Sequence, residues 1–345
     1  MAKETKTITI KDILKGCEPG RIQTVGYMQV IPLVSDLHDD RFVAPSGAKV
    51  GTSSYGTLVI RNTADQTMIL PAQIGYVVNQ QAQDHALPHV GLVKGKDMRA
   101  FDTAACIQQS QGGYIAEGEH QMLVLPLPLR ETAHTMRKER NYSRLWPAIS
   151  NLNAQAGISK TYGSGGHLEY FLKEFKNELE TFVAQFEPVE NQIGAIIIIN
   201  GKLMGIERAP NPEYWLDIWP ALIRECYGSM AILEAKKHGP TPPVPKTRVS
   251  LGKVKSLDEL KQKLVGVTEE EYNRVKTIVA NLLGLELASE VDEAFGGKMN
   301  VEAVSNKRFV GQIVTDDSKV VYASLVSCAK TPTAEDFYMQ EEFKM

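Results

Sequence analysis

Four arginines recur at regular intervals in one basic segment of the chain. They are Arg130, Arg137, Arg140 and Arg144. The last three stand at positions i, i+3 and i+7, so a helix over 130–146 would place them on one face. The first would join that face if the helix begins early. Guanidinium groups bind phosphates and carboxylates through paired hydrogen bonds. The spacing therefore predicts an anion-binding face, and the alternative is a solvated face paired with Glu131 and Glu139.

A glycine-rich loop follows this segment and directly precedes a predicted helix. Its candidate ligand-binding residues are Ser164, Gly165, Gly166 and His167. Backbone N–H groups at the start of a helix suit a phosphate. The loop is not a Walker A loop, because it lacks the lysine, and it follows a helix where a Rossmann loop follows a strand. We expect it to form one anion site with the arginine face; the alternative is a flexible connection between helices.

Two polar loops hold the remaining groups that could do chemistry. Asp84 beside His85 could position an acid or base, and His85 with His89 could bind a metal, although the proline between them disfavours a helical ligand pair. Cys106 could act as a nucleophile only if folding brought a base to it, such as His85 or His120. Plain hydrogen-bonded loops are the alternative, and we predict neither a metal site nor a cofactor.

The composition narrows the class of protein. The chain has 345 residues, 43% of them hydrophobic, and a formal net charge of −3, which makes nucleic-acid binding unlikely. No apolar run approaches the roughly 20 residues that cross a bilayer, and the first residues lack the apolar core of a signal peptide. The four cysteines lie far apart and form no CxxC pair, which is typical of free thiols in a reducing cytoplasm.

Strand patterns dominate the first half of the chain and helix patterns the middle. We predict strands at 56–61, 68–70, 74–78, 89–93, 103–108 and 121–125. Asn200-Gly201 between two apolar runs predicts a type I′ hairpin. The apolar period over 166–186 indicates a helix, and Asn211-Pro212 begins another in which Pro220 predicts a kink or break.

The last third follows a proline-rich stretch. Capping boxes at Ser256 and Thr268 predict two helices, and strands at 308–314 and 319–326 are expected to return to the sheet of the first half. The fold class is therefore α+β: an antiparallel sheet or sandwich packed with several amphipathic helices. We divide the chain into a core at 1–238, a linker at 239–250, a helical pair with closing strands at 251–328, and a polar tail at 329–345.

Four stretches, taken in order, resemble a known family. The first stretch comprises residues 58–62 and 73–75, and the second is the basic segment that ends at 145–146, followed by Thr161. The third comprises residues 192–207, followed by Trp215 and Cys226-Tyr227, and the fourth comprises 311–312 and 320–322. The chain is similar to the ARG and rhodanese-phosphatase-superfamily-associated domain family (ARPP). The resemblance implies an α+β domain linked by context to ADP-ribose and NAD-derived nucleotides. Where the family has a Cys-x-Glu-x-Gly-Arg-Trp-like stretch, only Arg130 corresponds.

Together these features favour a non-catalytic binding or assembly protein on an ARPP-like scaffold, recognising a phosphate-bearing, ADP-ribose- or NAD-like ligand. One alternative is an enzyme acting on an ADP-ribose or NAD-derived nucleotide. Another is a self-assembling structural protein. In each case we expect the chain to associate with itself as a homo-oligomer.

Overall fold

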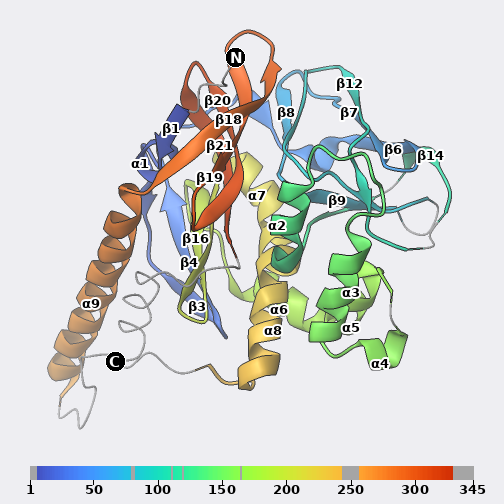
Figure 1. Ribbon diagram of the computed structural model, residues 1–345. Coiled ribbons are helices and arrows are strands. Elements are labelled where there is room, and N and C mark those ends of the chain that lie inside the picture. Colours follow the sequence, from blue (N-terminus) through green and yellow to red (C-terminus); the bar gives the residue numbers. More distant parts are fainter. Residues whose placement is uncertain are drawn as a thin grey trace.

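The chain folds into a large antiparallel sheet, three small sheets and a set of helices, so the predicted α+β class is confirmed (Figure 1). This computed structural model describes residues 6–78, 82–109, 112–118, 120–163, 165–242 and 256–328. Within those ranges, no helix has both the length and the apolar content to cross a membrane.

The main sheet joins strands from both ends of the chain. Its order is β1-β18-β19-β20-β21-β17-β16-β4-β2, with β3 also paired to β4. The closing strands join this sheet, where β21 pairs with β17, whereas most of the strands predicted for the first half lie in the small sheets. The strands are β1 (Lys6–Thr9), β2 (Glu18–Pro19), β3 (Gln23–Val25), β4 (Met28–Val34), β16 (Gln192–Ile199), β17 (Lys202–Arg208), β18 (Glu286–Phe295), β19 (Met299–Ser305), β20 (Phe309–Asp316) and β21 (Lys319–Ser327).

The predicted hairpin lies at the centre of this sheet. Asn200 and Gly201 have φ angles of 50° and 74°, the left-handed conformation that a type I′ turn requires. All eight residues of β16 are buried. Its alternate side chains enter two hydrophobic clusters, with Ile197 in one and Ile196 in the other. Burial on both faces explains why this strand is a continuous apolar run.

The small sheets contain most of the strands predicted for the first half. Their orders are β13-β10-β9-β15, β11-β8-β5 and β12-β7-β6-β14. The strands are β5 (Phe42–Val43), β6 (Lys49–Ser54), β7 (Thr57–Arg61), β8 (Thr67–Leu70), β9 (Ile74–Val77), β10 (His85–Ala86), β11 (Gly91–Val93), β12 (Met98–Phe101), β13 (Ala105–Cys106), β14 (Ile115–Gly118) and β15 (Gln121–Val124).

Helices cover both faces of the main sheet. In Figure 1, α9 lies on one side of its central strands and α7 with α8 on the other. The helices are α1 (Ile10–Ile13), η1 (Pro45–Gly47), α2 (Leu127–Thr135), α3 (Trp146–Gln155), α4 (Ser159–Tyr162), α5 (Leu168–Glu174), α6 (Lys176–Gln185), α7 (Pro212–Ala221), the π-helix η2 (Leu222–Tyr227), α8 (Gly228–His238) and α9 (Leu257–Leu283).

Two helix predictions are wrong. The helix expected over 130–146 ends at Thr135, because the charged run after it has no apolar side chains to bury and Asn141 accepts hydrogen bonds from Ser143 in a local turn. Ser256 does cap α9, but the helix continues through the second capping box without a break. Pro220 lies near the end of α7, where the helix continues directly as a π-helix, so the kink or break predicted at this proline is present only as a change of helix type.

Candidate functional site

The four arginines do not share a face, because only Arg130 lies on a helix. It projects from α2 into the core and pairs with Glu207, Nη1 to Oε1 at 2.8 Å. Its Nε donates to Gln73 Oε1 at 2.9 Å and its Nη2 to Ser324 Oγ at 2.5 Å. The Tyr227 hydroxyl also donates to Glu207, at 2.7 Å. The group is therefore a buried ion pair with its hydrogen bonds satisfied.

This buried ion pair connects α2, β17, β21 and η2. Gly205 makes the Tyr227 contact possible, since a Cβ at that position would lie 2.0 Å from the tyrosine oxygen. Gln73, Glu207 and Tyr227 all come from the stretches that carry the family resemblance. Every member of the group is at most 3% exposed, so its role is to hold the scaffold and not to contact a ligand.

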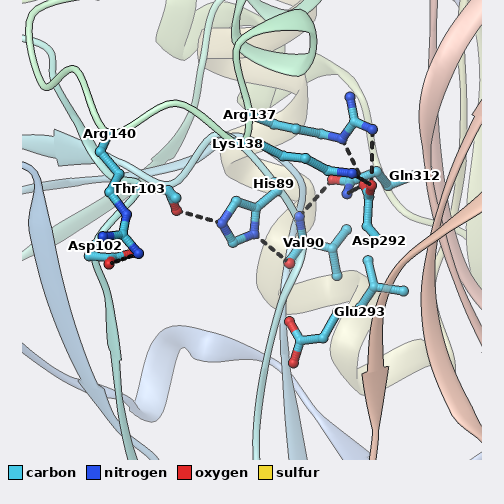
Figure 2. Close-up of a pocket in the computed structure, with 11 residues that line it drawn as sticks. His89, Val90, Asp102, Thr103, Arg137, Lys138, Arg140, Asp292, Glu293 and Gln312 are labelled. Carbon is cyan, nitrogen blue, oxygen red and sulfur yellow. Dashed lines mark hydrogen bonds and ion pairs between the residues drawn. The ribbon is translucent and has the colours of Figure 1, made fainter.

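Basic side chains of the segment after α2 line a cavity of about 210 Å³ (Figure 2). The loops beside β10 and β12, the segment after α2, and strands β18, β19 and β20 line it. Arg137 binds Asp292 with two hydrogen bonds, Nε to Oδ2 at 2.6 Å and Nη2 to Oδ1 at 3.0 Å. Lys138 Nζ lies 2.6 Å from the same carboxylate. Two of the basic residues singled out by spacing, Arg137 and Arg140, therefore line one cavity.

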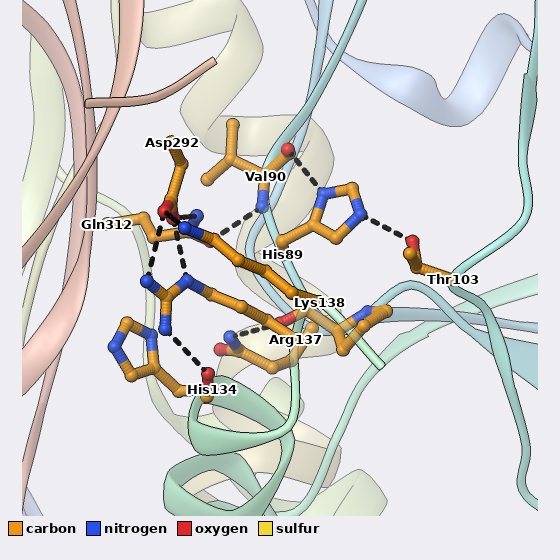
Figure 3. Close-up of polar contacts among 10 residues, drawn as sticks. His89, Val90, Thr103, His134, Arg137, Lys138, Asp292 and Gln312 are labelled. Atoms are coloured by element: carbon orange, nitrogen blue, oxygen red, sulfur yellow. Dashed lines mark hydrogen bonds and ion pairs between the residues drawn. The ribbon is translucent and has the colours of Figure 1, made fainter. Parts of the chain in front are cut away.

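Asp292 is the fixed centre of this arrangement (Figure 3). Burial opposes its ionisation, but its bonds to Arg137 and Lys138 outweigh burial and lower the pKa of the carboxyl group to about 2. Gln312 donates to Asp292 at 2.9 Å and accepts from the Val90 N–H at 2.8 Å. Arg137 is thus committed to the scaffold, whereas the side chain of Lys138 is 57% exposed.

A hydroxyl and an imidazole meet in the same cavity. His89 Nδ1 lies 2.8 Å from the Val90 carbonyl, which can only accept, so Nδ1 carries the proton. His89 Nε2 must then accept from the Thr103 hydroxyl, 2.7 Å away. Burial lowers the pKa of His89 and keeps the ring neutral. Figure 2 shows this pair between Arg140 with Asp102 and Arg137 with Asp292. The pair has the geometry to transfer a proton.

The other two arginines differ in exposure. Arg140 pairs with Asp102 at 2.9 Å and its side chain is 78% exposed. Arg144 is buried and donates to the backbone carbonyls of Thr103, Ala104 and Asn141. Arg144 therefore shapes the loop that carries Thr103, and Arg140 is the arginine that reaches solvent at the cavity.

The glycine-rich loop binds amide side chains. Gly166 N donates to Gln109 Oε1 at 2.8 Å, and Glu169 N, in the first turn of α5, donates to Gln108 Oε1 at 3.2 Å. Gly165 and His167 accept from Asn153 through their carbonyls. Ser164 lies outside the described residues. None of the described loop residues lines the Arg137 cavity, so the structure does not bring the two halves of the predicted anion site together.

Folding does bring Cys106 to His85, with Sγ 3.4 Å from Nε2. Both side chains are fully buried, and burial raises the pKa of the thiol to about 12 and lowers that of the imidazole to about 4. Asp84 does not complete a triad through its Oδ1, which accepts from the Val78 N–H. The pair is therefore neutral and structural. Among the described residues, no group of three or more histidines, cysteines or carboxylates could hold a metal ion.

Sequence reasoning missed Lys138, Thr103, Asp292 and Gln312. Asp292 is 155 positions from Arg137, and nothing in its local sequence marks it as a partner. The candidate site belongs to an α+β protein with a charge-lined cavity between its small sheets and its main sheet. The chain belongs to the family of the ARG and Rhodanese-Phosphatase-superfamily-associated Protein domain, whose sequence model matches residues 16–325. Comparisons with curated proteins and with solved structures found no match.

We expect Arg130→Met to lower the free energy of unfolding by about 3–5 kcal/mol, because it leaves Glu207 charged and buried without a partner. Replacing both residues with methionine should cost less than the two single changes together. Arg140→Met, which breaks an exposed pair, should cost about 1 kcal/mol or less. Urea denaturation gives the free energy of unfolding of Arg130→Met, Glu207→Met, the double variant and Arg140→Met. An effect of Arg130→Met as small as that of Arg140→Met would refute the structural role of the buried pair.

The Cys106–His85 pair predicts a pH dependence. The folded pKa of His85 is about 4, against 6.5 for the free group, so its stabilising effect is complete above pH 6.5 and is lost as the pH falls to 4. In His85→Gln, the decrease in the free energy of unfolding between pH 6.5 and pH 4 should be smaller by up to about 3 kcal/mol. The readout is the free energy of unfolding from pH 4 to 7. The exposed His38→Gln is the matched control variant and is measured over the same pH range.

Proposed function

We propose that this protein is a non-catalytic binding protein that recognises a phosphate-bearing small molecule in the Arg137 cavity. The ligand class suggested by the family resemblance is an ADP-ribose- or NAD-like compound. The observation that carries the proposal is the position of Lys138 and Arg140, two exposed cations that line one cavity beside a hydroxyl group.

The cations keep donors for an anion even though both form ion pairs. An ammonium group has three N–H donors and a guanidinium group five, and the pairs with Asp292 and Asp102 use only part of them. The Arg140–Asp102 pair is exposed on both sides, and such pairs stabilise a fold by about 1 kcal/mol or less, so a bound phosphate can reorient Arg140 at little cost. Lys138 can keep its contact with Asp292 and still donate to a phosphate through its other N–H groups. Arg137, Asp292 and Gln312 form the rigid floor that positions them.

ADP-ribose should raise the melting temperature of the wild-type protein, because a ligand that binds only the folded state stabilises it. Lys138→Ala combined with Arg140→Ala should remove most of this shift. The control is Arg61→Ala, which breaks a similarly exposed pair with Glu117 away from the cavity. The measurement is a thermal-shift titration at low salt.

No shift with ADP-ribose, NAD or nucleoside phosphates would contradict the binding proposal. Chromatography of the ligand after incubation tests the enzyme alternative, for which the Thr103–His89 pair supplies a proton acceptor. Intact ligand supports binding without catalysis. Cleaved ligand, with cleavage lost in His89→Gln, would make the protein an enzyme.

A second candidate function is self-assembly through α9. The helix buries Val275, Ile278 and Leu282 against the main sheet, but Leu257 and Val265 near its other end are 67% and 57% exposed. Their spacing of eight residues places them on one side of the helix. Exposed apolar side chains gathered on one face are typical of an interface between protein chains.

Light scattering after size exclusion should give more than one chain per particle for the wild-type protein. Leu257→Lys with Val265→Lys should reduce the mass to that of a single chain, since charges cannot be buried in an apolar interface. Leu216→Lys is the matched control, because Leu216 is also exposed but lies on α7. A monomeric wild type would contradict assembly without affecting the ligand proposal.

A further inference from the structure

Three tyrosines from separate parts of the chain form an exposed aromatic surface. Tyr55 lies in the turn between β6 and β7, Tyr114 precedes β14, and Tyr142 precedes α3. They are 49%, 52% and 38% exposed. The ring centroids of Tyr55 and Tyr142 are 5.3 Å apart in a stacked arrangement, and those of Tyr55 and Tyr114 are 5.4 Å apart in an edge-to-face arrangement. We call these three residues the tyrosine surface.

The backbone beneath the tyrosine surface is firmly held. The Tyr142 carbonyl accepts from Cys106 N at 2.7 Å, and the Trp146 ring lies edge-to-face against the Tyr142 ring at 5.8 Å. Gly56 has a φ of +77°, and a Cβ there would lie 3.1 Å from the Cβ of Tyr142. The Tyr142 ring and the turn that carries Tyr55 are thus placed before any ligand arrives, and a prearranged surface costs little ordering on binding.

The tyrosine surface adjoins the Arg137 cavity through two segments that run side by side. Residues 102–106 contact residues 140–144 at three points: the Asp102–Arg140 ion pair, the Ala104–Arg144 hydrogen bond and the Cys106–Tyr142 hydrogen bond. Arg140 and Tyr142 are two residues apart, so their Cα atoms are within about 7 Å of each other. One small molecule can therefore reach both.

We propose that the tyrosine surface is a nucleobase site, and that the ligand of the Arg137 cavity is a nucleoside phosphate whose base stacks on these rings. The inference rests on the proposed function, since it takes the phosphate position from it. Aromatic side chains stack on bases of any kind because every base presents a π-face. The phosphate would lie at Arg140 and Lys138, and the sugar would cross the Thr103 loop between them.

The charges favour a single nucleotide over a nucleic-acid strand. Strand binding requires a positive groove that follows many phosphates. Among the described residues that line the cavity, Lys138 and Arg140 are the exposed cations, and Asp102 and Glu293 line it too. The net charge of the whole chain is −3. These features suit one or two phosphates attached to one base.

The test compares adenosine 5′-monophosphate with ribose 5-phosphate, which carries the same phosphate and sugar without the base. Isothermal titration of the full chain should show about tenfold tighter binding of the nucleotide. Tyr55→Ala and Tyr114→Ala should bring that ratio close to one while leaving ribose 5-phosphate binding unchanged. Tyr114→Phe should keep the ratio, because it keeps the ring.

Tyr272→Ala is the matched control, because Tyr272 is also 52% exposed but lies on α9. Equal affinities for the two compounds, or a ratio that survives both alanine variants, would overturn the nucleobase site and leave the phosphate site standing. If neither compound binds, the proposed function fails and the nucleobase site fails with it.

Discussion

The buried pair of Arg130 and Glu207 is the constraint on which the candidate site depends. Two charges in a protein interior are tolerated only when each is paired and its remaining hydrogen bonds are made. Gln73, Ser324 and Tyr227 supply those bonds, and they come from separate parts of the fold. Because Arg130 lies on α2, the network fixes that helix against β17 and β21. The cations of the cavity follow α2 directly, so their position over β18 and β20 is fixed as well.

Local patterns predicted the parts of the fold that short-range physics determines. The Asn200-Gly201 turn requires positive φ angles at both positions, and few other residue pairs adopt them. The apolar run of β16 and the cap at Ser256 are equally local. The helix over 130–146 failed for the complementary reason. Helical spacing of arginines says nothing of an apolar face, and without one the segment after Thr135 has no reason to remain helical.

The candidate site was only partly predictable, because burial and not spacing decides what each arginine does. Arg130 lies in the core, Arg137 is held by Asp292, and Arg144 binds backbone carbonyls. Arg140 alone of the four extends into solvent. All four look alike in the sequence. Arg130 and Arg137 have partners on strands up to 194 positions away, and only the assembled sheet brings those strands to α2 and the loop after it.

The same distinction separates reactive groups from structural ones near the tyrosine surface. Cys106 and His85 have the types and the separation of a catalytic pair, but burial holds both neutral. The Cys106 backbone instead holds Tyr142, whose ring is accessible. A nucleophile must be ionised and reachable to react, whereas an aromatic ring needs only an open face to stack. In this part of the protein the buried polar groups therefore provide structural support. The exposed rings and cations are the groups that can contact a ligand.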